Sequence, residues 1–576
     1  MRHPILLTAA LLFAGIAASA QNLNPVVEVT NTYEQSAAGI DKPDQTIAVP
    51  DSLLRFNLDV DYEMRTAPYK GAYEFNPYLV ELKPMPRLTG EGTLLVRLGA
   101  GYGFHPELDA VWSPVKKDNF RMNLYARHNG YFGPYRSMIS GSFMDTFLRE
   151  AVNENGVHVF QADKETLYNG SDATTSAGVN TLLNWNTGSW TSDLHYTNLL
   201  ASDEWTQSNH HVVSLQTRVK SAQASPTYYN LGVKGSYLAR TDGVKGGQLM
   251  LDGGIGTNRR GSQARLDLFG EAIFTQRGEA GQFGFIPRYV FRIGSLHLNL
   301  GLKLAFTYRS QEDYYPNKGG FVFPDVRVDF RVVPEDFILY ASATGGNVMR
   351  GYAPLLMENH FLASFGNDGY DVEVEHVNIA AGARGNIGRR LRFDSKLGFS
   401  YKTNAALWGF FDDPDKRPQT EEGFTTGFPV YSYWSPFLGK DNYGLFYVDF
   451  EGGWESESVT ADAHLRYQAS NLKNDYLFAP AAFTAQAKFM YNWADRIKAG
   501  VNLDASTARM TQPETEGALV YSLPGYADLG LYGEYGITRK FAAWLKVGNL
   551  LNQEVQRTPF HAERGIYFTI GVQYHM

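Results

Sequence analysis

Residues 296–308 read LHLNLGLKLAFTY, and apolar and polar side chains alternate along this stretch. One side of an extended chain receives Leu296, Leu298, Leu300, Leu302, Leu304, Phe306 and Tyr308, and the other receives His297, Asn299, Gly301, Lys303, Ala305 and Thr307. Because successive side chains of a strand point to opposite faces, the spacing predicts a β-strand with one apolar face. Its 13 residues are enough to cross a bilayer, which takes roughly 9–11 in a tilted strand.

The same alternation recurs along most of the chain, including its last 13 residues. Residues 564–576 read RGIYFTIGVQYHM, and their apolar row is Ile566, Phe568, Ile570, Val572, Tyr574 and Met576. Between residues 91 and 576 there are about 22 such runs, within a range of about 18–22. Consecutive long amphipathic strands of this kind predict one large all-β domain over residues 91–576.

The connections between these runs alternate in length. Short links fall near residues 186, 293, 333, 387, 494 and 538, and long polar links fall at 309–320, 345–372, 403–441, 468–481, 507–525 and 550–564. Short periplasmic turns and long extracellular loops are typical of a transmembrane antiparallel β-barrel. A soluble all-β protein is the alternative, but strand length, loop asymmetry and aromatic residues near strand ends favour the barrel.

Composition agrees with an exported β-protein. The chain has 576 residues with 35 Tyr, 36 Phe, 57 Gly and no Cys, and its net charge of -8 argues against a nucleic-acid partner. Residues 1–20 combine Arg2, an apolar core and an Ala-Ser-Ala site, which predicts a signal peptide cleaved near Ala20. Residues 21–90 are then expected to form a periplasmic or partial-plug segment, with the barrel in the outer membrane.

The C-terminal 37 residues, 540–576, resemble the last strand pair of TonB-dependent outer-membrane receptors. The resemblance rests on an amphipathic strand, an Asn549-Leu550-Leu551-Asn552 turn and a last strand of alternating aromatics. Such receptors usually end in Phe. This chain ends in Met576, which is also apolar and lies on the same face of the expected strand. The resemblance implies that the row from Ile566 to Met576 is recognised by the barrel-insertion machinery.

Residues 26–33, 50–84 and 125–133 resemble a set of Bacteroidota outer-membrane barrels that are related to TonB-dependent receptors but lack the usual plug. The resemblance implies that either the short segment 21–90 and in-folded loops occlude the lumen, or the barrel is partly open. The stretch Val26, Val27, Glu28, Val29 and Thr30 resembles the peptide that such receptors offer to TonB. A plain extended periplasmic segment is the alternative for these five residues.

One long loop carries a candidate ligand site. Its residues are Trp408, Phe410, Phe411, Asp412, Asp413 and Asp415. Aromatic rings stack on a ligand ring, and carboxylates bind a cation or sugar hydroxyls. A solvated loop tip and cation bridging to surface lipid are the alternatives.

Three further features carry expectations about packing. Residues 345–362 form the most apolar long loop, which we expect to pack into the barrel mouth, and residues 137–152 suggest a short amphipathic helix. The polar faces of the strands carry Arg265, Asp267, Glu271, Lys303 and Lys488. These charges either hold water and anchor a plugging segment or neutralise one another across strands.

No catalytic constellation, metal site or cofactor site stands out; His210 and His211, for example, lack further ligands at a suitable spacing. The sequence therefore favours a non-enzymatic outer-membrane receptor or transporter that passes or receives a solute through its lumen and outer loops. Its expected partners are outer-membrane lipid, the insertion machinery, and TonB or other envelope proteins. A structural, assembly or secretion subunit is the main alternative, and an outer-membrane hydrolase is a third.

Overall fold

The structure is a computed structural model that describes residues 93–140, 147–202, 207–222, 225–241, 243–259, 262–276, 278–309, 319–333, 336–361, 372–410 and 437–576. The predicted signal peptide, the segment 21–90 with Val26 to Thr30, and Phe411, Asp412, Asp413 and Asp415 lie outside these residues. In the described part of the chain, no helix is both long and apolar enough to cross a membrane.

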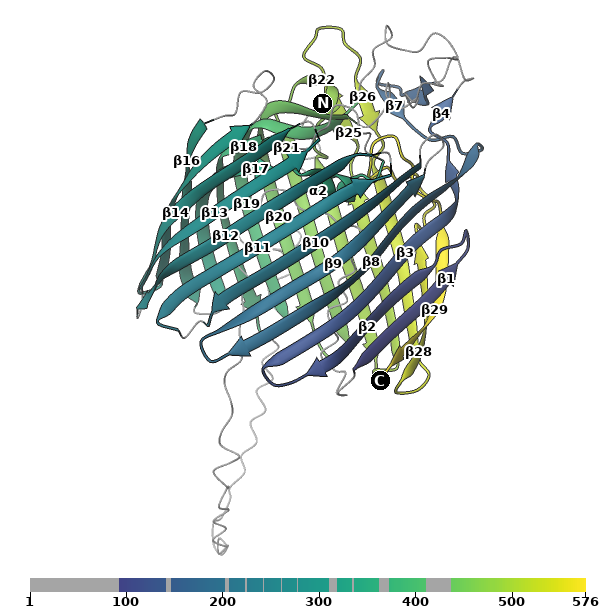
Figure 1. The fold of residues 1–576 in the computed structure, drawn as a ribbon. Coiled ribbons are helices and arrows are strands. Elements are labelled where there is room, and N and C mark those ends of the chain that lie inside the picture. Colours follow the sequence, from purple (N-terminus) through teal and green to yellow (C-terminus); the bar gives the residue numbers. More distant parts are fainter. Residues whose placement is uncertain are drawn as a thin grey trace, which may run out of the picture. The chain divides into compact units, whose positions relative to one another are not determined.

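One sheet closes on itself as a barrel, and all neighbouring strands of the barrel wall are antiparallel (Figure 1). Of the 27 strands that are joined in this sheet, 22 form the barrel wall. The first eleven are β1 Leu94–Gly101, β2 Glu107–Lys116, β3 Phe120–Arg136, β8 Leu167–Trp185, β9 Gly188–Ser202, β10 Gln207–Ser221, β11 Thr227–Arg240, β12 Lys245–Arg259, β13 Ser262–Thr275, β14 Glu279–Ile293 and β15 Leu296–Arg309. The second eleven are β16 Gly319–Val333, β17 Phe337–Met349, β18 Val372–Ile387, β19 Leu391–Gly409, β20 Phe437–Glu455, β21 Val459–Ser470, β23 Phe483–Trp493, β24 Ile497–Ser506, β27 Tyr526–Gly536, β28 Phe541–Gly548 and β29 Tyr567–His575.

Each wall strand pairs with the next one along the chain, and β29 pairs with β1. The closing register runs from Leu95 opposite His575 to Gly101 opposite Thr569. We call this β1–β29 junction the seam. The prediction of a closed antiparallel barrel of about 22 strands is therefore confirmed.

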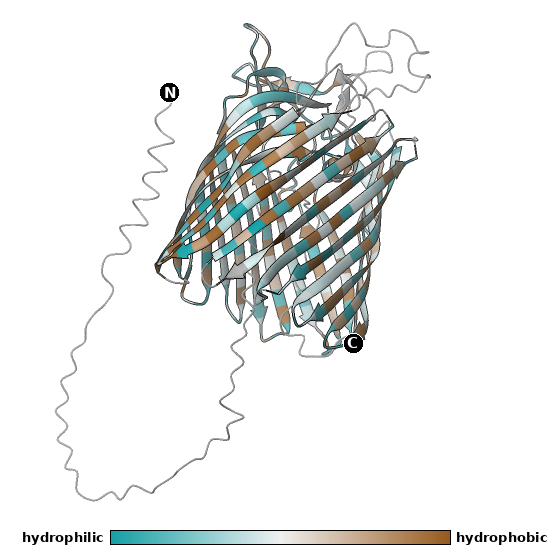
Figure 2. Ribbon diagram, turned by 60° about the vertical axis from the view of Figure 1, so that its left-hand side comes forward, coloured by the Kyte–Doolittle hydropathy of each residue, from teal (hydrophilic) through white to brown (hydrophobic). Residues whose placement is uncertain are grey.

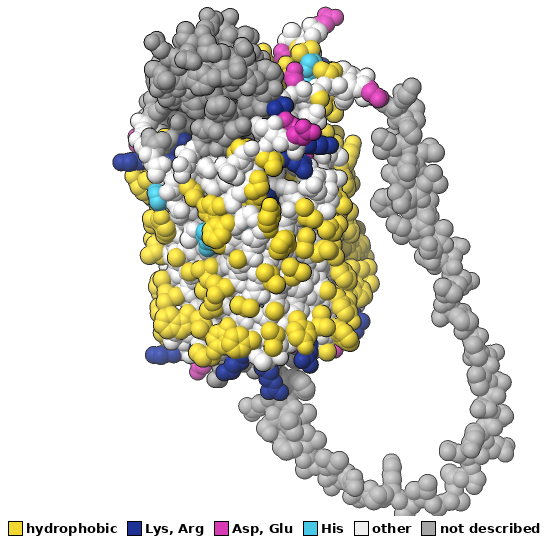
Figure 3. All heavy atoms as spheres, turned by 90° about the vertical axis from the view of Figure 1, so that its right-hand side faces the viewer, with side chains coloured by type: hydrophobic (Ala, Val, Ile, Leu, Met, Phe, Trp, Pro, Cys, Tyr) yellow, Lys and Arg dark blue, Asp and Glu magenta, His cyan; other side chains and the backbone are white. Residues whose placement is uncertain are grey.

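The alternation of the sequence decides which side chains face outward. On β15, Leu300, Leu302 and Phe306 are exposed on the outside, while Ala305 between them is fully buried on the inner face. Apolar and polar residues alternate along the strands in the same way around the wall (Figure 2). On the side seen in Figure 3, hydrophobic side chains are spread over a broad band of the wall, and Lys and Arg gather at its edges. This band is the surface that faces the hydrocarbon of the outer membrane.

Short turns close the periplasmic end. The link between β23 and β24 contains a tight turn: Ala494 and Asp495 both have positive φ, at 53° and 56°, and the Arg496 amide donates to the Trp493 carbonyl at 3.0 Å. Two central residues of positive φ define a type I′ turn, whose twist matches that of antiparallel strands.

The strands extend further toward the extracellular end than the sequence predicts. The expected links 345–372 and 403–441 are shorter, because β17 continues to Met349, β19 continues to Gly409 and β20 begins at Phe437. The β17–β18 pairing shifts its register between Thr344 and Gly346, with the extra residue on β18, and the β19–β20 pairing shifts between Lys402 and Ala405, with the extra residue on β19. A bulge moves later side chains to the opposite face, so the alternation breaks there although the strand continues.

The extracellular loops contain short elements of their own. They are β4 Ile139–Ser140, β5 Phe147–Leu148, β6 Glu150–Val152, β7 His158–Phe160, α2 Tyr352–Glu358, β22 Asn474–Phe478, β25 Arg509–Gln512 and β26 Tyr521–Leu523. The predicted helix at 137–152 is wrong for its described residues, which form β4, β5 and β6. These strands satisfy their backbone groups by pairing, β4 with β5 and β6 with β7.

Candidate functional site

The inner face of the wall carries charged side chains that pair across strands. Arg288 donates to Asp267 at 2.7 Å and to Asp325 at 2.8 Å. Gly301 on β15 stands in register between Arg288 and Asp325, and its lack of a side chain leaves room for the arginine to span that strand. Arg265 also lies 3.1 Å from Asp267. For these residues the contacts favour mutual neutralisation, one of the two roles expected from the sequence.

Residues 350–361, which contain α2, fold into the barrel; we call them the lid. Leu355 and Leu356 are buried against Leu199 on β9, Val212 on β10 and Leu238 on β11. These three wall residues belong to the inner face, because the exposed Val213 and Tyr237 next to them point outward. The expectation that the apolar loop 345–362 packs into the mouth is confirmed for these two leucines.

Polar contacts hold the lid at its C-terminal end. The Trp408 indole N–H donates to the Glu358 carboxylate at 2.6 Å, and Arg350 lies 3.6 Å from the same carboxylate. Arg350 also reaches Glu373 on β18 at 3.5 Å. Of the predicted ligand residues, Trp408 therefore contacts the lid from the end of β19.

A histidine just after α2 ties the lid to β8, the strand next to β9. His360 Nδ1 lies 2.7 Å from Asp172 Oδ1 on β8. Burial alone would lower the pKa of His360, but the Asp172 carboxylate outweighs it and raises that pKa above its ordinary value. The ring of the next residue, Phe361, lies against the His561 ring at a tilt of 31°, with ring centroids 4.0 Å apart. Burial lowers the pKa of His561 to about 4, so this ring is neutral near pH 7.

We expect the lid to loosen as the pH rises. The folded-state pKa of His360 lies above the unfolded value of about 6.5, so its ion pair stabilises the lid fully below that pH. That stabilisation, about 1.5–3 kcal/mol for a hydrogen bond between charged groups, is lost as the pH passes through the folded-state pKa. Deuterium uptake at the α2 amides, corrected for intrinsic exchange, should be faster at about pH 9 than at about pH 6.

The matched control for this pH effect is Asp172→Asn, which keeps the side-chain shape and removes the negative charge. This variant should show fast exchange at both pH values. Equal corrected exchange of the wild-type protein at both pH values would show that the ion pair does not hold the lid.

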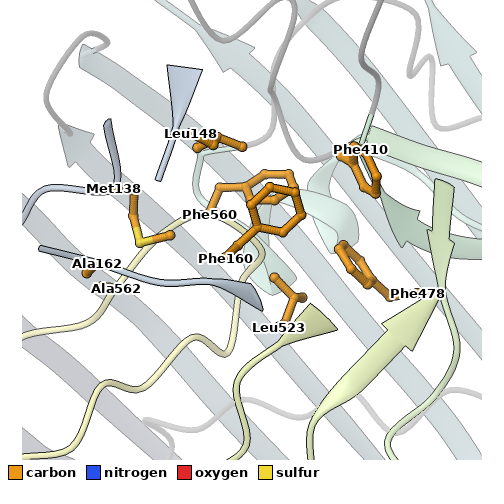
Figure 4. Packing of buried hydrophobic residues seen from close by; sticks show 9 residues of the cluster. All are labelled: Met138, Leu148, Phe160, Ala162, Phe410, Phe478, Leu523, Phe560 and Ala562. Carbon is orange, nitrogen blue, oxygen red and sulfur yellow. The ribbon is translucent and has the colours of Figure 1, made fainter. Parts of the chain in front are cut away.

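An aromatic cluster from separate extracellular loops lies at the same end; we call it the cap cluster (Figure 4). Its members are Met138, Leu148, Phe160, Ala162, Phe410, Phe478, Leu523, Phe560 and Ala562, with Tyr521 packed against them. Phe160 stacks on Tyr521 at 5.4 Å and meets Phe560 edge-on at 5.1 Å. Phe410, a predicted ligand residue, is 1% exposed and lies 4.6 Å from Tyr521.

The sequence did not single out Phe160, Tyr521, Phe560, His360 or Asp172. Each is an isolated aromatic or polar residue in a loop or strand, and no spacing along the chain joins it to its partners. Asp172 and His360, for example, are 188 residues apart. The scattered aromatics in otherwise polar loops were the one signal available.

The loop 549–566 is fixed to the inner wall. Arg557 donates to Asp528 on β27 at 2.7 Å and to Asp504 on β24 at 3.0 Å, and it also contacts Glu563. In the Asn-Leu-Leu-Asn turn, Asn549 and Asn552 have positive φ of 45° and 49°, a conformation that Asn tolerates. The Asn549 side chain donates to the Gln553 carbonyl at 2.8 Å, so the motif shapes the start of this loop.

The C-terminal strand lies where the sequence suggested. Ile566, Phe568, Ile570 and Val572 are exposed on the outer face, and Tyr574 shares that face. The Met576 amide donates to the Leu94 carbonyl at 2.9 Å, so the last residue extends the seam.

Among the described residues, no three His, Cys, Asp or Glu side chains are placed to hold a metal ion.

These features define the class of the protein: a closed 22-stranded barrel of the outer-membrane type, with extracellular loops folded into its mouth. The sequence matches no protein-family model and no curated protein sequence.

Three solved structures of transporters and receptors share this fold. The FrpB iron transporter from Neisseria meningitidis (F5-1 variant) is similar with a TM-score of 0.57 and 10% identity, over 84% of this chain and 82% of that chain. The siderophore receptor PirA from Acinetobacter baumannii gives 0.55 and 9%, over 84% and 80%. The ferric-catecholate import receptor Fiu from E. coli K12 gives 0.56 and 8%, over 84% and 81%. At such low identity the likeness is one of fold.

Proposed function

We propose that the protein is an outer-membrane receptor that admits a solute through its lumen, in the manner of TonB-dependent receptors. The observation that carries this proposal is the lid: a short helix that is held against the inner wall by two leucines and a few polar contacts. A small closure of this kind can open without disturbing the 22-stranded wall. The fold likeness to an iron transporter and to siderophore receptors supports a role in import rather than catalysis.

The proposed domain organisation follows from the sequence. Residues 1–20 are removed as a signal peptide near Ala20, residues 21–90 form a periplasmic or partial-plug segment, and residues 91–576 form the barrel. We assign the solute contact to the loop that holds Trp408, Phe410, Phe411, Asp412, Asp413 and Asp415. The apolar row from Ile566 to Met576 is assigned to recognition by the insertion machinery, with outer-membrane lipid around the wall.

Deleting residues 26–30 is expected to abolish import without affecting insertion. This stretch can add a strand to the sheet of a TonB protein, and the energy for import would be transmitted through that contact. A chromosomal deletion strain is complemented with the full chain or with the variant, and depletion of solutes from the medium is followed by mass spectrometry. The solute that only the full chain depletes identifies the ligand.

Deletion of residues 36–40, which are equal in number and close by, serves as the matched control. This control should restore import. If the variant lacking 26–30 restores import as well as the full chain, the assignment of Val26 to Thr30 is wrong. If neither chain depletes any solute and the barrel co-purifies stoichiometrically with other envelope proteins, the structural-subunit alternative is favoured.

A further inference from the structure

The end of β19 contacts both the lid and the cap cluster. Trp408 and Phe410 are two positions apart, so in an extended chain they share a face. The Trp408 indole donates to Glu358 of the lid at 2.6 Å. The Phe410 ring lies in the cap cluster, 5.4 Å from Phe160. A displacement of this one segment therefore changes the packing of the cap and of the lid together.

The loop 549–566 makes a second connection of the same kind. Phe560 packs in the cap cluster, 5.1 Å from Phe160. Its neighbour His561 packs against Phe361 of the lid, with ring centroids 4.0 Å apart. Two chain segments that are far apart in sequence thus each hold the cap with one residue and the lid with a residue one or two positions away.

The second connection is strained. Phe560 has a φ of +64°, in the left-handed region that a bulky L-residue rarely occupies. Such a conformation persists only where the surrounding contacts fix it. Here the contacts are the cap on one side of the peptide and the lid on the other. Loss of either set lets Phe560 relax and weakens the remaining one.

We propose that the cap cluster and the lid are energetically coupled through Trp408–Phe410 and Phe560–His561, so that opening the cap releases the lid. A solute that displaces the cap cluster would then first open the cap and afterwards release the lid from the lumen. The coupling is reciprocal, because a change that favours the open lid must favour the open cap by the same factor. It concerns the contacts of the closed state and does not depend on which solute is imported.

A single-cysteine reporter tests this coupling, because the chain contains no native cysteine. Leu199 is fully buried on the wall beneath the lid, so a Leu199→Cys variant reports lid opening to a membrane-impermeant maleimide added outside intact cells. Phe160→Leu loosens the centre of the cap without touching the lid. We expect it to raise the labelling rate at least about tenfold, within the usual range of coupling factors.

Three controls complete the experiment. Val152→Ala alters an exposed residue of the same loop and should leave the rate unchanged. Ala305→Cys, buried on the inner wall at β15, should stay unlabelled with Phe160→Leu. A compact band in unboiled gels confirms that each barrel is folded. The proposal is overturned if Phe160→Leu leaves the rate at Leu199→Cys unchanged, or if Ala305→Cys is labelled equally, since the wall itself would then have loosened.

Phe560→Gly provides a second, independent variant. It removes the buried ring from the cap, and the cost of losing this ring outweighs the relief of backbone strain that follows because glycine tolerates positive φ. Labelling of Leu199→Cys should rise as with Phe160→Leu, and combining the two substitutions should raise it less than the product of their separate factors. Strictly multiplicative effects would show that Phe160 and Phe560 do not act through one coupled cluster.

Discussion

Replacing Leu356 with aspartate is expected to release the lid from the barrel wall. Leu356 is fully buried against Leu199 and Val212, and burying a leucine contributes about 1.5–3 kcal/mol. The new carboxylate would lie among the apolar side chains of this cluster, and burying it there would cost several kcal/mol more. Together these terms exceed what the remaining contacts of a seven-residue helix supply, so the closed state should become the minor one.

The Leu199→Cys reporter measures this release directly. In combination with Leu356→Asp, external maleimide should label the cysteine at least about a hundredfold faster, as expected for a loss of roughly 3 kcal/mol or more. Met357→Asp is the matched control, because Met357 is the next residue of α2 and its side chain is 39% exposed. If both aspartate variants label alike, the lid is held by its polar contacts and not by the buried leucines.

The barrel was predictable because the pattern that specifies each of its strands lies within a short, continuous stretch of sequence. Each wall strand alternates lipid-facing and lumen-facing side chains, and this pattern appears in the order of residues within a single strand. The prediction of strand ends failed where this alternation is interrupted. In β19 the register shift after Lys402, with Asn404 at a φ of 56°, reverses the phase, so residues 403–409 resemble a loop although they are paired.

The site was predictable only in part because the residues that contact one another there are far apart in the sequence. The apolar character of Leu355 and Leu356 indicated inward packing, since exposing apolar side chains to water is unfavourable. Trp408 and Phe410 were also found, as an aromatic pair beside an acidic run. Their partners were not, because Glu358 lies 50 residues before Trp408 and comes close only when the barrel closes.

The seam should be intolerant of a methyl group at Gly571. The Trp544 ring lies next to both Gly571 and Gly99, which are paired across the seam, and the Arg97 guanidinium lies over the ring at 4.0 Å from its centroid. A Cβ at Gly571 would overlap the Leu98 carbonyl oxygen as well as the indole. Because that oxygen belongs to the backbone of β1, relief requires the two strands to separate. Gly571→Ala should therefore abolish the fast-migrating folded band in unboiled gels.

Gly99 offers a sharper test of the same packing, since the atoms nearest to a Cβ there belong to side chains, chiefly to the Trp544 ring. Gly99→Ala should lose the folded band alone and regain it when combined with Trp544→Ala, whereas Gly571→Ala should gain nothing from that second change. Trp544→Ala removes a buried ring at a cost of about 3–5 kcal/mol, so it must be assayed alone as well. Gly533→Ala on β27, where an added Cβ meets nothing, controls for the loss of glycine itself. Rescue of both glycine variants by Trp544→Ala would place the whole constraint in the indole ring, and rescue of neither would place it in the backbone of the seam.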